Sequence, residues 1–135
     1  KVKLKQAMQV AAPVLQVHAL QKGQSISYGR TFTAPKQMQV AIIGAGYAQG
    51  FSRGLSNKGF MLLCGKRVPV LGRVCMQLTA VDVSEVCGVK EGDFAWLMGG
   101  DGPNAITADE LASAWATIPY EVFCIMGTIN GRYYF

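Results

Sequence analysis

The chain has 135 residues, of which 50% are hydrophobic and 16% charged, with 16 glycines and a formal net charge of +5, so we expect one folded domain with many turns. No apolar run reaches the roughly 18 residues of a membrane span, and no signal-peptide pattern opens the chain, so we expect a soluble cytoplasmic protein without a membrane partner. The cysteines form no C-x-x-C pair and there is one histidine, which excludes a recognisable metal site and predicts reduced, mostly buried thiols at Cys64, Cys75, Cys87 and Cys124.

The N-terminal segment carries the densest basic cluster, at Lys1, Lys3 and Lys5. A short run of this kind indicates a solvated, frayed terminus rather than an arm for nucleic acid. The first residue is Lys rather than Met, so we also expect the chain to be a piece of a longer protein.

Short apolar segments recur along the chain between breaks that contain glycine. Segments of four to seven residues rich in Val, Ile, Leu and Met are typical of strands in a sandwich or barrel. In chain order, we expect strands near residues 14–20, 39–43, 60–63, 68–70, 74–83, 95–98 and 122–126.

One helix is expected in the C-terminal third of the chain. Thr107 and Glu110 have the T-x-x-E spacing of a capping box, and an apolar run follows them. The helix should cover residues 108–116, because Pro119 disfavours helical geometry at Ile118. The fold class predicted for residues 1–135 is therefore all-β, a mostly antiparallel barrel or sandwich, with one short helix.

Two glycine-rich turns suggest nucleotide binding but lack the required context. Residues 44–50 (G-A-G-Y-A-Q-G) follow an apolar run, yet Gly54 and Gly59 interrupt any following helix and no acidic residue lies about 20 positions on. Residues 99–102 (G-G-D-G) lack the G-K-S/T ending of a phosphate loop, so we expect a surface turn. His18 lies in an alternating strand without a recognisable nucleophile, so we expect a structural role for it.

The polar aromatic residues at glycine-flanked or proline-flanked breaks are the most suggestive side chains. Such tyrosines usually pack with the hydroxyl in water. A phenol can also carry a proton, although its ordinary pKa of about 10 requires neighbouring positive charge for work near neutral pH. Both roles stay open for Tyr28, Tyr47 and Tyr120, and the basic residues close to them or to turns are Arg30, Arg53 and Arg73.

Four segments together resemble the alanine racemase family. Residues 26–34 (ISYGRTFTA) resemble its V-S-Y-G-x-T-[YF]-x-A stretch, and residues 46–53 (GYAQGFSR) resemble G-Y-A-D-G-x-x-R. Residues 70–76 (VLGRVCM) resemble V-x-G-R-[IV]-C-M, and residues 117–124 (TIPYEVFC) resemble T-I-x-Y-E-[VI]-x-C. Because order and approximate spacing also agree, the chain is identified as resembling the C-terminal β domain of these two-domain, PLP-dependent enzymes.

The resemblance implies a head-to-tail homodimer that interconverts L- and D-alanine and supplies D-alanine for peptidoglycan precursors. Each protomer would combine an α/β barrel, which carries the lysine that binds pyridoxal 5'-phosphate, with a β domain that reaches the partner's barrel. This chain would be the β domain alone. Its partners would be alanine and the N-terminal barrel domains of its own protomer and of the second protomer, with no nucleic acid.

The resemblance also assigns roles to individual residues. Tyr28 would be the base that faces the PLP-lysine across the substrate Cα, since two bases on opposite faces can remove and return a proton with inversion. Met76 would place its backbone amide near the substrate carboxylate, and Tyr120 would hydrogen-bond the cofactor phosphate. The residues that would line the entrance are Tyr47, Arg53, Arg73 and Ile118.

Three departures from the family pattern leave other functions open. Gln49 and Gln77 stand where the family has aspartates, and residues 129–131 (I-N-G) replace R-V-P. A broad-specificity or serine/alanine racemase domain, an inactive interaction domain and the β domain of a related PLP decarboxylase are alternatives. A nucleic-acid-binding β-barrel is another, because basic charge with exposed aromatics can form a stacking platform, and salt-sensitive binding to single strands would reveal it.

Overall fold

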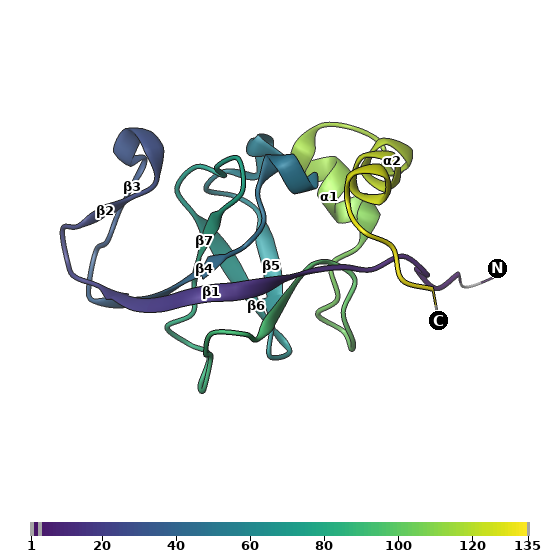
Figure 1. Cartoon of the computed structure of the whole chain (residues 1–135). Helices are drawn as coiled ribbons and strands as arrows, with labels where there is room; N and C mark the ends of the chain where they lie inside the picture. Colours follow the sequence, from purple (N-terminus) through teal and green to yellow (C-terminus); the bar gives the residue numbers. More distant parts are fainter. Residues whose placement is uncertain (1, 3, 135) are drawn as a thin grey trace.

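The computed structural model describes residue 2 and residues 4–134, and within them six strands close into an antiparallel barrel (Figure 1). Around the barrel the order is β1-β4-β7-β6-β5-β8. The strands are β1 (Val10–Leu20), β4 (Met38–Ile43), β5 (Phe60–Leu63), β6 (Lys66–Leu71), β7 (Thr79–Asp82) and β8 (Phe94–Met98). The predicted all-β class is thus confirmed, as a barrel rather than a sandwich.

The long strand β1 closes the barrel because it pairs on both sides. Its first part pairs with β8, with Val10 opposite Met98, and its second part pairs with β4, with Leu20 opposite Met38. Inward-facing aliphatic side chains of these strands fill the barrel, as alternation along a half-buried strand requires. Among them Val14, Ile43 and Val81 are almost fully buried.

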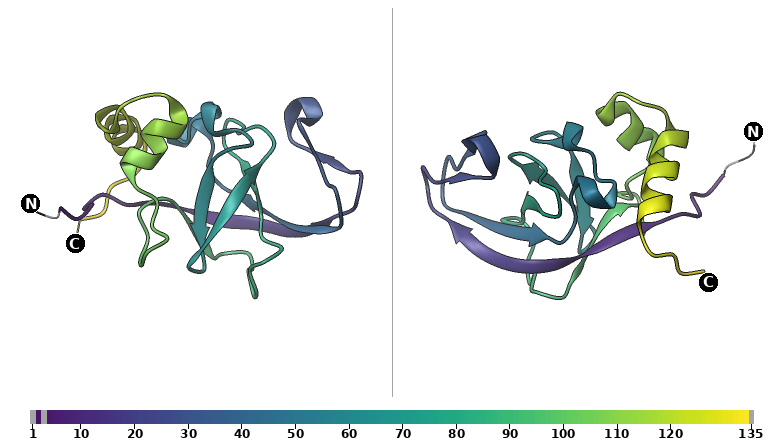
Figure 2. Two further views of the ribbon diagram at one scale, coloured as in Figure 1. Left: turned by 180° about the vertical axis from the view of Figure 1, so that it is seen from behind. Right: turned by 45° about the horizontal axis from the view of Figure 1, so that its top comes forward.

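A small hairpin stands apart from the barrel at the far end of β1. It consists of β2 (Ser25–Ile26) and β3 (Phe32–Thr33), joined by the 3₁₀ turn η1 (Tyr28–Arg30). All three ribbon views show it projecting beyond the barrel wall (Figures 1 and 2). At its base, Ile26 and Phe32 pack against a second, smaller hydrophobic cluster of buried residues. The hairpin therefore places Tyr28 outside the barrel wall.

Two α-helices cover the opposite end of the barrel, α1 (Ala108–Trp115) and α2 (Pro119–Ile129). The capping prediction is confirmed, since the Glu110 N–H donates to Thr107 Oγ1 at 3.1 Å. Ala116 lies in the left-handed region (φ 64°) and ends α1 one residue earlier than predicted. Buried side chains of both helices join the barrel core.

The strand predicted for residues 122–126 is wrong, and so is the expectation of one helix. These residues lie in α2, which buries Val122 and Met126 on one face. Pro119 was interpreted only as a stop for the preceding helix, whereas it is the first residue of the next one, where its missing N–H costs nothing. The β-branched and aromatic residues here concealed the i, i+4 spacing.

Two further expectations are corrected. The strand predicted for residues 74–83 begins only at Thr79, because Val74 to Leu78 form a loop that pairs with another loop. The cysteines are free but not mostly buried: Cys64, Cys87 and Cys124 are exposed, and Cys75 is half-buried. Small thiols tolerate turns and helix surfaces, so composition alone did not place them.

The two glycine-rich segments lead into short turns. Residues 44–50 lead into the short 3₁₀ turn η2 (Tyr47–Gln49), followed by η3 (Arg53–Leu55), and not into a nucleotide-binding helix. Residues 100–102 lie in a turn after β8. No described helix is long and apolar enough to cross a membrane. Of the basic N-terminal cluster, Lys1 and Lys3 lie outside the described residues.

Candidate active-site face

The candidate site begins where two loops pack backbone against backbone. Tyr47 N donates to Cys75 O at 3.0 Å and Ala48 N donates to Met76 O at 2.8 Å. A Cβ on Gly46 would lie 2.0 Å from Cys75 O, so only glycine permits this approach. The two family-like segments at residues 46–53 and 70–76 are therefore joined directly.

The hairpin tip docks on the other side of the same loop. Ser27 Oγ donates to Arg73 O at 2.6 Å. Gly72 has φ of +73°, and a Cβ there would lie 2.7 Å from the Ser27 Cβ. The Arg73 guanidinium lies against Gly29, since a Cβ on Gly29 would be 3.3 Å from Arg73 Cζ. These contacts bring Tyr28 and Arg73 onto neighbouring segments.

A third segment, which follows η3, is hydrogen-bonded to the same loop between β6 and β7. Val74 N donates to Ser56 Oγ at 2.9 Å, and Ser56 Oγ donates to Arg53 O at 2.6 Å. Asn57 accepts from Gly72 N at 2.7 Å through Oδ1. Arg53 itself is exposed on η3. The segment that carries Arg53 is thus hydrogen-bonded to the loop that carries Arg73 and Met76.

Helix α2 brings the last two predicted site residues to this side of the barrel. Asn130 Nδ2, at the end of α2, donates to Gln49 O at 2.9 Å, and Gly50 packs against Ile125 and Met126. Ile118 and Tyr120 lie at the other end of α2. In Figure 1 the hairpin tip, the β6–β7 connection, η2, η3 and both helices lie along the upper side of the barrel.

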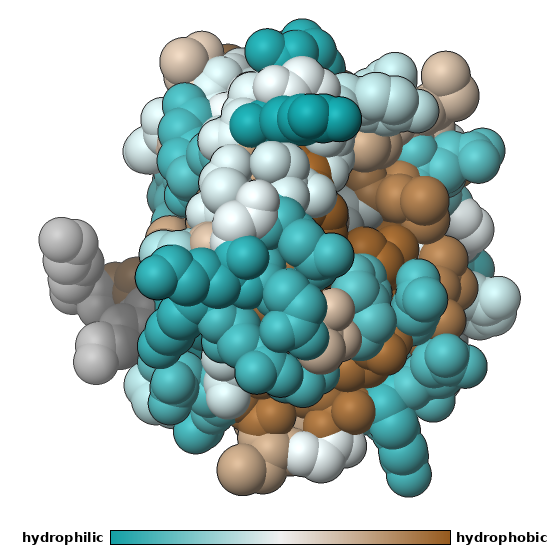
Figure 3. Space-filling model, turned by 90° about the vertical axis from the view of Figure 1, so that its left-hand side faces the viewer, coloured by the Kyte–Doolittle hydropathy of each residue, from teal (hydrophilic) through white to brown (hydrophobic). Residues whose placement is uncertain are grey.

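The side chains on this face are large and exposed. Exposed fractions are 73% for Tyr28, 43% for Tyr47, 57% for Met76, 59% for Ile118 and 78% for Tyr120. A group of large exposed side chains of this kind is typical of a surface that binds another molecule. Seen from the hairpin side, hydrophilic side chains cover the middle of the molecule and hydrophobic ones gather toward one edge (Figure 3).

Two groups on this face have hydrogen-bonding capacity left for a ligand. Among the hydrogen bonds of the described residues, none uses the Met76 N–H or the Tyr28 hydroxyl, whereas Met76 O is occupied by Ala48 N. A backbone N–H and a phenol are neutral donors that suit anionic or alcohol oxygens. The arrangement can therefore hold an anion near Met76 and offer a hydroxyl from the hairpin tip.

The N-terminus of α2 fits a phosphate group. Ile118 provides no side-chain cap and Pro119 has no N–H, while the Tyr120 phenol lies exposed on the first turn. Glu121 N and Val122 N both donate to Ile118 O, so among the described residues the Tyr120 N–H is the backbone donor of this turn left for an anion, and it adds to the favourable helix dipole. Glu121 on the same turn accepts a hydrogen bond from the Thr117 hydroxyl. No lysine belongs to the family-like segments that form this face, so the residues fit the phosphate end of PLP and not its carbonyl end.

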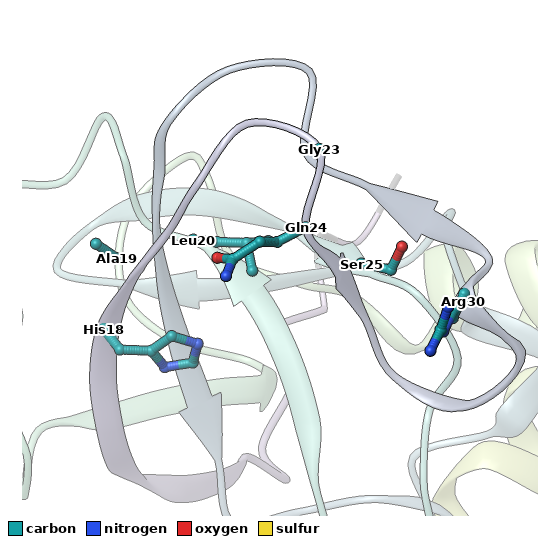
Figure 4. A pocket seen from close by; sticks show the side chains of 7 residues that line it. All are labelled: His18, Ala19, Leu20, Gly23, Gln24, Ser25 and Arg30. Atoms are coloured by element: carbon teal, nitrogen blue, oxygen red, sulfur yellow. The ribbon is translucent and has the colours of Figure 1, made fainter.

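A separate hollow of about 550 Å³ lies between β1 and the hairpin (Figure 4). Its lining comes from residues 18–20 of β1, residues 23–25 and Arg30. His18 reaches into it, and its Nδ1 is buried without a hydrogen-bond partner in the described part of the chain. It contains none of the seven predicted site residues, and no cluster of metal-ligating residues occurs in the described chain.

Sequence patterns missed the polar residues that hold the loops together. Ser27, Ser56 and Asn57 each bond to a segment at least 15 positions away in the chain. Local spacing carries no signal for such contacts, because they depend on how the barrel closes. Positive φ at Ser27 (68°) and Asn57 (57°) marks both as conformationally special, but only coordinates reveal it.

The sequence of the chain matches one family of known proteins. The family model described as "Alanine racemase, C-terminal domain" matches residues 7–134. An alanine racemase of Nitratidesulfovibrio vulgaris strain Miyazaki F is 64% identical over 124 residues, which cover 92% of this chain and 33% of that protein. One of Geobacter sulfurreducens is 45% identical over 125 residues, again 92% of this chain and 33% of the relative.

Solved structures of the same family match the fold of this chain. Alanine racemase from Bacillus anthracis with bound L-Ala-P matches with a TM-score of 0.85 and 33% identity, over 93% of this chain and 32% of that one. Alanine racemase from Bartonella henselae with covalently bound pyridoxal phosphate matches with a TM-score of 0.85 and 29% identity, over 94% and 34%. The chain thus spans about a third of the length of the relatives it matches.

Proposed function

Because the chain belongs to the family of alanine racemase C-terminal domains, we propose that it completes the active site of a PLP-dependent enzyme that interconverts L- and D-alanine. The observation that carries the proposal is the exposed tyrosine at the tip of a docked hairpin, on the same face as the Met76 amide and Tyr120. An open face of this kind requires an opposing surface to form a site that excludes water.

Tyr28 serves as one of two acid-base groups in this proposal. Its hydroxyl is presented at the hairpin tip, where it can take a proton from the Cα of one alanine isomer and return it to the other. The Arg73 guanidinium lies against Gly29, so the residue next to Tyr28 in the hairpin tip is in contact with a positively charged group. The second base is a lysine outside this chain, on the opposite face of the substrate.

The remaining residues bind and orient. Met76 donates its free backbone N–H to the substrate carboxylate, and Tyr120 with the N-terminus of α2 holds the cofactor phosphate. When bound, PLP delocalises the electron pair left on Cα after proton loss. Tyr47, Arg53, Arg73 and Ile118 line the entrance, where Gln49 and Gln77 leave less negative charge than the family pattern provides. The assembly proposed is a cytoplasmic homodimer in which this domain faces the partner's barrel.

Exchange of the Cα proton in the full-length protein tests the role of Tyr28. Tyr28→Phe removes one hydroxyl from a residue that is 73% exposed, so fold and PLP content should be unchanged. Deuterium uptake from solvent into L-alanine should fall by roughly 10² to 10⁴-fold, as for a positioned acid-base group. Uptake into D-alanine should largely survive, because the lysine acts on that face. Unchanged exchange of both isomers would show that Tyr28 is a packing residue.

A further inference from the structure

The hairpin tip is fixed at two points, one on each side of Tyr28. Before Tyr28, Ser27 Oγ donates to Arg73 O at 2.6 Å. After it, Thr31 Oγ1 accepts from Asn57 Nδ2 at 3.1 Å. Ser25 and Thr33, further down the hairpin, bond only to each other, at 3.1 Å between hydroxyl oxygens. Among the described residues, only residues 27 and 31, which bracket the 3₁₀ turn, have side-chain hydrogen bonds from the hairpin to the loops of the barrel.

Asn57 lies at the centre of the second point. Its side-chain Oδ1 accepts from Gly72 N at 2.7 Å, and its backbone N–H donates to Gly72 O at 3.0 Å. Gly72 in turn packs against Ser27, where a Cβ would be 2.7 Å from the Ser27 Cβ. One amide side chain therefore links the hairpin to the part of the barrel loop on which the first fixing point rests.

The tip needs this support because its backbone is strained. Ser27 and Arg30 have φ of 68° and 49°, conformations that residues with a Cβ seldom adopt, and they flank Tyr28 and Gly29. The 3₁₀ turn contains no buried residue, so packing does not hold it. Strained, exposed backbone keeps one geometry only when contacts around it impose that geometry.

We propose that Thr31 and Asn57 are positioning residues for proton transfer, acting through Tyr28. The inference rests on the proposed function of Tyr28. Loss of the Thr31–Asn57 hydrogen bond releases one side of the tip, so the phenol spends less time in reach of the substrate Cα. A displacement of about 1 Å can cost roughly 10²-fold in rate. Loss of the Thr31 hydroxyl leaves ground-state binding unaffected, since Thr31 does not contact substrate in the proposed arrangement and Asn57 keeps its bonds to Gly72.

Thr31→Val in the full-length enzyme tests the proposal, because it replaces the exposed hydroxyl with a methyl group of similar shape. Deuterium uptake into L-alanine should fall about tenfold, while uptake into D-alanine, KM for alanine and PLP content stay unchanged. Thr31→Ser, which keeps the hydroxyl, should restore the rate. Thr33→Val is the matched control: it removes a hydroxyl hydrogen bond of the same hairpin that does not reach the barrel, and it should leave both exchange rates unchanged.

Two more variants separate the possible outcomes. Asn57→Gly, which tolerates the positive φ of 57°, should also lower uptake into L-alanine more than uptake into D-alanine, and it should raise KM as well, because Gly72 N in the loop that carries Met76 loses its acceptor. Thr31→Val added to Tyr28→Phe should cause no further loss, because both act through one phenol. Equal losses for both isomers, or no loss at all while Tyr28→Phe remains lopsided, would overturn the positioning role and leave the proposed function standing. If Tyr28→Phe itself has no lopsided effect, the proposed function and this inference both fail.

Discussion

Gly46 shows how one residue type can decide whether two loops meet. Its φ of −150° is open to any residue, so backbone freedom is not the reason for glycine here. The reason is space, since a Cβ would lie 2.0 Å from Cys75 O and 2.7 Å from the Met76 carbonyl carbon, both backbone atoms that cannot move aside alone. The position of Met76 therefore depends on the absence of a side chain thirty positions earlier.

We expect Gly46→Ala to destabilise the chain by about 3 kcal/mol, at the upper end of the range for overpacking a closed interior. Urea unfolding of the 135-residue chain measures the change. Gly131→Ala provides the control, because nothing lies within 4 Å of its added methyl group and its φ is not positive, so stability should be unaffected. An unfolding midpoint for Gly46→Ala equal to that of Gly131→Ala would contradict the close approach.

Arg67 connects β6 to the start of α1, and its contacts explain why that helix sits where it does. Its Nη2 donates to Glu110 Oε2 at 2.8 Å and to Ala105 O at 2.9 Å, and its Nε donates to Asn104 O at 3.0 Å. The second guanidinium nitrogen also pairs with Glu110. A planar fork is needed to reach a carboxylate and two carbonyls at once.

Arg67→Met should therefore cost more stability than Glu110→Gln. Loss of the arginine leaves two carbonyls and a half-buried carboxylate without their donor, for which we expect about 2 kcal/mol. Glu110→Gln removes only the charge of a partly exposed pair, which costs about 0–1 kcal/mol. Arg67→Lys should behave like Arg67→Met, because one ammonium group cannot replace the fork. Thermal unfolding of the three variants checks the order, and equal losses for Arg67→Met and Glu110→Gln would show that the backbone contacts contribute little.

At the scale of elements, sequence patterns predicted what local chemistry determines. The capping box at Thr107 located α1 to within a residue, and alternating apolar segments located the strands of the barrel. The same reasoning failed for residues 122–126, where Val, Phe and Ile favour a strand in isolation. Packing against the barrel imposes the helix there, and Pro119 starts it, so tertiary context overrides propensity.

At the scale of the molecule, the candidate site depends on contacts between distant segments. The four family-like segments suggested the candidate residues, including Tyr28, Met76 and Tyr120, but not the contacts that hold them. Ser27, Thr31 and Asn57 gave no local signal, because their partners lie 26 or 46 positions away. Barrel closure through β1 brings these partners together, and no periodicity in the sequence encodes which loops then face each other.

The whole domain has a core of its own but presents an incomplete site. A closed barrel with two packed helices buries most aliphatic side chains of the described residues, so we expect the 135-residue chain to fold alone. The candidate face, in contrast, carries large side chains that are 43–78% exposed, and no lysine belongs to the family-like segments that form it. Folding and catalysis should therefore separate.

We predict that the isolated chain is folded yet neither attaches PLP covalently nor racemises alanine. Circular dichroism should show mostly β structure with a minor helical part, in keeping with six barrel strands and two short helices among the described residues.

After incubation with PLP and reduction with borohydride, no lysine should carry the cofactor. A lysine attacks the PLP carbonyl efficiently only when a dry, shaped pocket lowers its pKa and holds the phosphate. The exposed Tyr120 and the α2 N-terminus offer the phosphate contact without that pocket. A single lysine of this chain modified stoichiometrically after reduction, or racemisation above the rate of free PLP, would show that the site is complete within these residues.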